Sequence, residues 1–176
     1  MTGLRPHMWR LTTAVLTLSS LFVSVPLGAQ QASPSHAASV TISPLHLLNP
    51  QLHVTGEVRV APRLSTAAIL AGGNVTEEEQ TYRVWEIAGQ VRYYVLGAFS
   101  HGMMLGADVG YVDVNGQPES AMEMLVGTRA GGFLGYKRIL KGGFTAEVQL
   151  GPVYVWGNAG DSEWQTLSSL KLGWSF

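Results

Sequence analysis

The last thirteen residues of the chain, 164–176, alternate between apolar and polar positions almost without error. The even positions carry Trp164, Thr166, Ser168, Leu170, Leu172, Trp174 and Phe176. In a β-strand successive side chains point to opposite faces, so a period of two indicates a strand. We therefore predict a strand here, with a mostly apolar aromatic-ended face and a mostly small or polar face.

Seven earlier segments also have the composition of strands and are bounded by turn residues. In chain order, the eight strands are predicted at residues 40–47, 52–61, 64–73, 82–96, 102–114, 121–136, 143–156 and 164–176. Pro44 weakens the first of them, because proline has no N–H to donate to a neighbouring strand. After the first hairpin, short turns alternate with longer polar loops at 74–81, 115–120 and 157–163.

Most of these strands have one apolar face and one face of small, polar or charged residues. In the second strand, for example, Leu52 and Val54 lie opposite to His53 and Glu57. The third strand is the exception, because both of its faces are small or apolar. An even number of such strands, each near or above the ~9–11 residues that cross a bilayer, predicts a closed barrel with an apolar exterior.

The polar faces carry five acidic and five basic side chains. They are Glu57, Glu86, Asp108, Glu123 and Glu147, and Arg59, Arg92, Arg129, Lys137 and Lys171. An eight-stranded barrel is only wide enough to be filled by side chains, and charges inside it must be paired and hydrogen-bonded. We therefore expect a lumenal charge network that plugs the barrel, in preference to an ion path or catalytic carboxylates.

The apolar faces carry aromatic residues at both ends of the strands. Beside the longer loops lie Trp85, Tyr111, Trp156 and Trp164, and beside the short turns lie Tyr93, Tyr136, Phe144, Trp174 and Phe176. Ten residues separate Trp164 from Trp174. They correspond to about 33 Å of strand, or about 25 Å of depth at a tilt of ~40°. This depth matches the apolar band of a membrane-spanning barrel.

The N-terminus has the pattern of a secretory signal peptide. Arg5, His7 and Arg10 precede an apolar stretch at 11–25, and small residues follow up to Ala29. The stretch is shorter than the ~20 apolar residues of a transmembrane helix, so we expect cleavage and not anchoring. The expected organisation is a signal peptide at 1–29, a flexible leader at 30–38 and a barrel at 39–176.

Composition narrows the choice of partners. Cleavage after Ala29 leaves nine basic against twelve acidic side chains, a net charge of −3. That charge argues against nucleic acid as a partner. The absence of cysteine excludes disulfides and thiolate metal sites. We expect neither a cofactor nor a metal ion, because the sequence has no phosphate-binding glycine loop and no clustered metal ligands.

The signal peptide, the alternating strands and the terminal Gly-Trp-Ser-Phe sequence resemble small bacterial outer-membrane β-barrels. These include the OmpX-like proteins and the membrane domain of OmpA-like proteins. The resemblance implies an all-β fold, an eight-stranded antiparallel up-and-down transmembrane β-barrel in the outer membrane. It also implies an assembly signal, read by the barrel-assembly machinery, at Leu170, Leu172, Trp174 and Phe176.

The expected function is a structural or surface-interaction role without an open pore and without catalysis. The expected partners are outer-membrane lipids, lipopolysaccharide and, during biogenesis, the barrel-assembly machinery, and we expect a monomer.

Two alternatives remain open. An outer-membrane barrel enzyme acting on envelope lipids would gather a nucleophile, a base and a carboxylate at one rim, with Ser43, His53 and Glu57 as candidates. A soluble periplasmic lipocalin-like lipid-binding barrel would instead have an apolar interior and a polar exterior. Apart from these two functions, a metal site at His46 and His53 would need further ligands.

Overall fold

The computed structural model describes residues 36–48, 50–77, 80–115, 125–157 and 162–176. The predicted signal peptide, and the leader as far as residue 35, lie outside the described residues. The described elements are β1 (Ala38–Ile42), α1 (Pro44–Leu47), β2 (Gln51–Ala61), β3 (Leu64–Glu77), β4 (Gln80–Ala98), β5 (His101–Asn115), β6 (Leu125–Ile139), β7 (Phe144–Gly157) and β8 (Ser162–Ser175). Among these residues, no helix is long and apolar enough to cross a membrane.

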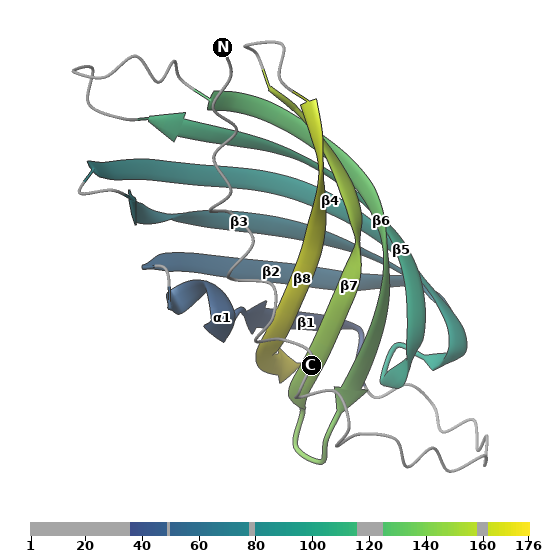
Figure 1. The fold of residues 1–176 in the computed structure, drawn as a ribbon. Helices are drawn as coiled ribbons and strands as arrows, with labels where there is room; N and C mark the ends of the chain where they lie inside the picture. Colours follow the sequence, from purple (N-terminus) through teal and green to yellow (C-terminus); the bar gives the residue numbers. More distant parts are fainter. Residues whose placement is uncertain (1–35, 49, 78–79, 116–124, 158–161) are drawn as a thin grey trace. The chain divides into compact units, whose positions relative to one another are not determined.

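The eight strands form one closed barrel in which each strand pairs with its neighbour in the sequence (Figure 1). All the pairings are antiparallel. The prediction of an all-β, eight-stranded antiparallel up-and-down barrel is therefore confirmed. The strands in the described residues lie close to the predicted segments, with ends that differ by a few residues at most positions.

A short seam between β1 and β8 closes the barrel. Val40 lies opposite Trp174 and Ile42 lies opposite Leu172. At the end of the chain, the backbone N–H of Phe176 donates to the carbonyl of Ala38 over 2.9 Å. Since β1 has only five residues and β8 has fourteen, the seam joins one end of β8 and leaves the remainder of this edge without a strand beside it among the described residues.

The first predicted strand, at 40–47, is wrong in its second half. The strand ends at Ile42, and Pro44–Leu47 forms the single turn of α1. Pro44 explains this ending, because it cannot donate to a strand ladder but fits the first turn of a helix. The chain therefore turns back early, and β2 begins at Gln51, opposite Gly73, while β3 continues to Glu77.

The long polar loop predicted at 74–81 is also wrong. β3 and β4 stay paired through Asn74 and as far as Glu77, which lies opposite Gln80. Val75 and Thr76 favour strands, and a paired neighbour lets a polar segment continue the ladder. Because the prediction relied on polar composition alone, it ended the pairing of these two strands too early.

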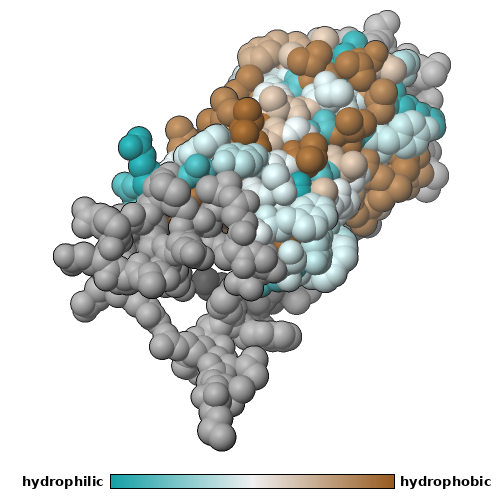
Figure 2. Space-filling view, turned by 90° about the horizontal axis from the view of Figure 1, so that it is seen from above, coloured by the Kyte–Doolittle hydropathy of each residue, from teal (hydrophilic) through white to brown (hydrophobic). Residues whose placement is uncertain are grey.

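Side chains alternate between the lumen and the exterior as the apolar pattern predicts. The exterior carries the large apolar residues, and Val109, Leu150 and Trp174 are all at least half exposed. Apolar residues cover much of the wall seen in Figure 2. The third strand, which had no clear polar face in the sequence, directs Ser65 and Ile69 inward and Leu70 outward.

Candidate functional site

Five buried charged residues meet in the lumen toward the short turns, and we call them the floor cluster. They are Glu57, Arg92, Lys137, Glu147 and Lys171, each at most 2% exposed. Glu57 lies at the centre, because its carboxylate is 2.7 Å from Lys137 Nζ and 2.8 Å from Arg92 Nη1. It also accepts hydrogen bonds from the hydroxyls of Ser65, at 2.5 Å, and Tyr94, at 3.0 Å. The two positive charges and these donors offset the cost of burying the Glu57 carboxylate.

Glu147 extends the floor cluster to the opposite wall. Its carboxylate accepts a hydrogen bond from Arg92 Nη1 at 3.1 Å, and Lys171 Nζ lies 3.6 Å away. Gln149 supports both groups, since its amide donates to Glu147 over 2.7 Å and accepts from Lys171 over 3.2 Å. The floor cluster thus holds three basic and two acidic side chains in one connected network.

A second group, the upper cluster, lies toward the longer loops and consists of Glu86, Asp108 and Arg129. Arg129 Nε donates to Asp108 over 3.0 Å, and Arg129 Nη2 lies 2.7 Å from Glu86 Oε1. The Glu86 contact is an ion pair and not an aligned hydrogen bond, because this oxygen has no hydrogen-bond partner. Gln90 links the two clusters by donating to Asp108, at 2.9 Å, and accepting from Arg92, at 2.7 Å.

Eight of the ten predicted network residues lie in these two clusters. Their four acids and four bases are equal in number, so the upper cluster supplies the negative charge that the floor cluster lacks. Arg59 is partly exposed near the end of β2 and forms no ion pair with another described residue. Glu123 lies outside the described residues.

Sequence reasoning did not identify an apolar group that fills the short-turn end of the lumen. It consists of Tyr94, Phe99, Met104 and Phe133, each at most 4% exposed. Lys137 Nζ lies 3.7 Å from the centre of the Phe99 ring, so a cation–π contact adds to its ion pair. Strict alternation from Arg92 and Lys137 would have placed Tyr94 and Phe133 inside. Phe99 follows the end of β4 and carries no such signal.

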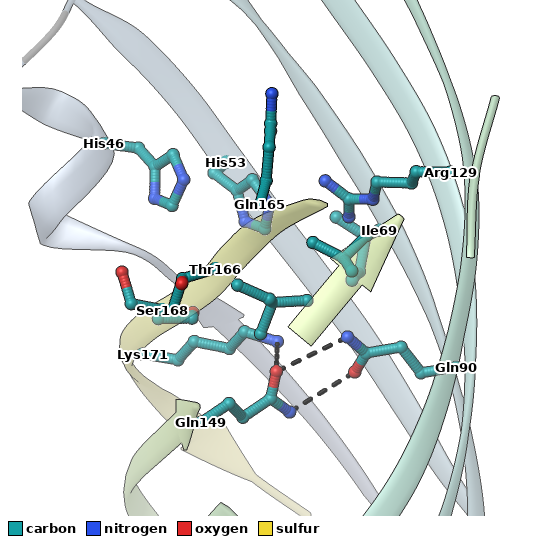
Figure 3. Close-up of a pocket in the computed structure, with 13 residues that line it drawn as sticks. His46, His53, Ile69, Gln90, Arg129, Gln149, Gln165, Thr166, Ser168 and Lys171 are labelled. Carbon is teal, nitrogen blue, oxygen red and sulfur yellow. Dashed lines mark hydrogen bonds between the residues drawn. The ribbon is translucent and has the colours of Figure 1, made fainter. Parts of the chain in front are cut away.

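Above the floor cluster is a cavity of about 130 Å³. Figure 3 shows the residues that line it. They are His46, His53, Ile69, Gln90, Arg129, Gln149, Val153, Gln165, Thr166, Leu167, Ser168, Ser169 and Lys171. This lining includes two basic side chains and no carboxylate. Two of its buried polar atoms, His53 Nδ1 and Ser169 Oγ, have no hydrogen-bond partner.

The two histidines reach the cavity from α1 and β2. Their rings stack with centroids 4.5 Å apart and planes inclined by 20°. His46 Nδ1 is also 2.8 Å from Ser43 Oγ. Burial, with smaller contributions from the charges of Lys171 and Arg129, lowers the pKa of His46 from its ordinary value. This shift favours the neutral form of the His46 ring.

The structure does not bring together the catalytic set of Ser43, His53 and Glu57. Ser43 contacts His46, and its side chain is almost completely buried. Glu57 is engaged by the floor cluster. Among the described residues, neither imidazole ring has a carboxylate as a hydrogen-bond partner or ion-pair partner. A Ser43–His46 pair is present, but it lacks the carboxylate that orients the base in a triad.

The stacked histidines do not complete a metal site either. Within the described part of the chain, no group of three or more histidine, cysteine, aspartate or glutamate side chains is placed to hold a metal ion. Comparisons with protein-family models, curated proteins and solved structures found no match. The function of the chain is therefore inferred from the geometry of the barrel.

Proposed function

We propose that the protein is an integral outer-membrane β-barrel with a structural or surface-interaction role, a plugged lumen and no catalytic activity. The observation that carries the proposal is the polarity of the barrel. Its buried interior holds Glu57, Arg92 and Lys137, while Val109 and Leu150 face outward. A wall with this polarity matches lipid outside and paired charges inside, which is the arrangement of membrane barrels.

Aromatic clusters at the two ends of the strands support the proposal. Tyr154 packs edge-on against Trp156 and Trp164 at the long-loop end. Phe144 packs against Trp174 at the short-turn end. Aromatic rings favour the level of the lipid head groups, where an apolar body meets a wet boundary. The two clusters would mark the two surfaces of the membrane.

The alternatives fit these observations less well. A lipocalin-like soluble barrel would keep its apolar residues inside, but this lumen contains eight ionisable side chains in two linked clusters. A barrel enzyme would need a carboxylate beside its base, and neither His46 nor His53 has one among the described residues. These contrasts favour a non-catalytic membrane barrel.

The lumenal contacts also support a barrel without an open pore. The floor cluster and the apolar group around Tyr94 and Phe133 fill the short-turn end with side chains that are almost completely buried. Moving an ion past them would require breaking buried ion pairs, at a cost of about 3–5 kcal/mol each. We expect lipids, lipopolysaccharide and the assembly machinery as partners, and a monomer in the membrane.

Fractionation of a Gram-negative host that expresses the full chain tests this proposal. We expect the protein in the outer-membrane fraction after a urea wash, with a gel mobility that changes on heating because the folded barrel resists detergent. Planar bilayers containing the purified protein should show no steady conductance. Release of the protein in soluble form by osmotic shock would contradict the membrane location, and long-lived open channels would contradict the plugged lumen.

A further inference from the structure

The barrel wall has a notch on the long-loop side of the seam. β1 ends opposite Leu172, so among the described residues no strand pairs with this edge of β8 from Ser162 to Lys171. The N–H of Phe176 points to β1, and strand directions alternate along β8. The backbone groups of Ser168 and Leu170 therefore face the notch. In the hydrocarbon of a membrane, the backbone N–H and C=O groups of such a strand edge need hydrogen-bond partners.

The cavity reaches the exterior through this notch. Its lining includes Ser169 and Lys171, which point into the lumen, and Thr166 and Ser168 from the outer face of the same strand. Along this stretch β8 has no partner strand among the described residues, so the two faces of β8 meet at its open edge beside the cavity. Figure 3 shows β8 passing between the Ser168 side and the Gln90 side of the cavity.

The chemistry of the cavity favours a small anionic group. Arg129 and Lys171 line the space; Arg129 is ion-paired with Glu86 and Asp108, and Lys171 with Glu147 at 3.6 Å, but none of these carboxylates lines the cavity. His53 Nδ1 and Ser169 Oγ are at least nine-tenths buried and have no partner, although buried polar atoms are normally hydrogen-bonded. A volume of about 130 Å³ accommodates one phosphate-sized group or several waters.

The surroundings of the notch favour a lipid as the bearer of that group. Leu47, at the end of α1 beside β8, and Leu48, which follows α1, are 49% and 80% exposed. Leu170 and Trp164 continue the apolar wall along β8 on either side of Thr166 and Ser168. Acyl chains can lie against these apolar side chains while a polar head group enters between them.

We propose that the notch between α1 and the free edge of β8 binds the phosphate-bearing head group of a membrane lipid, with His53, Ser169 and Lys171 facing the phosphate. The proposal rests on the membrane location argued above. It assigns a ligand to a cavity that the lumenal side chains leave open beside the seam.

Native mass spectrometry of the purified full chain in detergent tests the proposal. The probes are short-chain phosphatidylglycerol, phosphatidylcholine of the same chain length, and inorganic phosphate. We expect one equivalent of phosphatidylglycerol to bind more tightly than phosphatidylcholine, with little competition from inorganic phosphate. Equal binding of both lipids would overturn the anionic site. Full displacement by inorganic phosphate would overturn the lipid as the source and leave a site for a free anion.

Two variants and a matched control connect the binding to the cavity. Ser169→Ala removes an unpartnered hydroxyl, and His53→Phe keeps a ring for stacking but removes its nitrogens. Each should weaken phosphatidylglycerol binding about tenfold, the usual effect of losing a hydrogen bond to a charged group. Thr55→Val removes another buried unpartnered hydroxyl that does not line the cavity, and it should leave binding unchanged.

The same samples separate this proposal from the membrane proposal. Outer-membrane fractionation and heat-dependent mobility report whether each variant has folded and inserted. Variants that insert normally and still bind phosphatidylglycerol as the original chain does would overturn the site and leave the membrane barrel intact. If His53→Phe does not fold, Ser169→Ala decides alone, because the hydroxyl it removes has no partner.

Discussion

At the scale of single residues, the sequence predicted which side chains face the lumen. Alternation predicted correctly that Glu57 and Lys171 point into the lumen, because a period of two leaves no freedom of face once one side is apolar. It did not predict which charges meet. Lys137 reaches Glu57 across the barrel from a residue 80 positions away in the chain, and such a contact depends on closure and register.

Glu57 provides the sharpest test of the charge network. Glu57→Gln removes the charge that two basic side chains share, so we expect the free energy of unfolding to fall by about 3–5 kcal/mol. Urea titration of the barrel in detergent, followed by the heat-dependent gel shift, measures the loss. Arg59→Gln on the same strand is the control and should change stability by less than about 0.5 kcal/mol. Equal stability of the two variants would mean that the network contributes little.

Gly106, which faces the lumen, tests how the barrel makes room for large side chains, and Gly89 on the outer face of β4 is its control. A Cβ atom on Gly106 would overlap the ring of Phe133, whereas one on Gly89 would meet nothing within 4 Å. We expect Gly106→Ala to destabilise the barrel by about 1–3 kcal/mol through overpacking. Gly89→Ala should be neutral or slightly stabilising. The unfolding midpoint in urea compares the two, and a neutral Gly106→Ala would show that Phe133 can move aside.

At the scale of elements, the strands were predictable and their ends were not. The periodic segments identified all eight strands, because each buries one face along most of its length. Helix α1 was missed, since four residues around Pro44 carry no helical period. The predicted pairing of β3 with β4 was too short, because the last pairs, up to Glu77 and Gln80, depend on the partner strand. The notch beside β8 follows from these ends, so the sequence did not reveal it.

The C-terminal strand carries a prediction about assembly. Phe176 is 62% exposed, and only its backbone joins the seam with Ala37 and Ala38. We expect Phe176→Ser to lower the amount of protein in the outer membrane several-fold while leaving heat-dependent mobility of the inserted fraction unchanged. Phe144→Ser removes another outward aromatic at the same end and should insert normally. Quantified outer-membrane fractions test this, and equal losses would indicate a general need for aromatic surface.

At the scale of the whole molecule, the barrel has its charged residues inside and its large apolar residues outside. Charged residues are paired within the lumen, and Val148, Leu150 and Leu134 are exposed on the outside. A single strand does not show which of its two faces is interior. Closure of the barrel decides this for all the strands together. The same polarity that closes the lumen would make the exterior insoluble in water and stable in lipid.

The central claim is that lipid surrounds the outer face, and the cysteine-free chain allows it to be measured directly. Val148→Cys and Leu150→Cys place a polarity-sensitive fluorophore midway along β7, and Lys141→Cys places it at an exposed turn. In vesicles containing the full chain, the labels at 148 and 150 should emit as in hydrocarbon and be quenched by lipids with nitroxide groups on their acyl chains. The label at 141 should emit as in water and escape quenching. Water-like, unquenched emission at 148 and 150 in the folded protein would contradict the account.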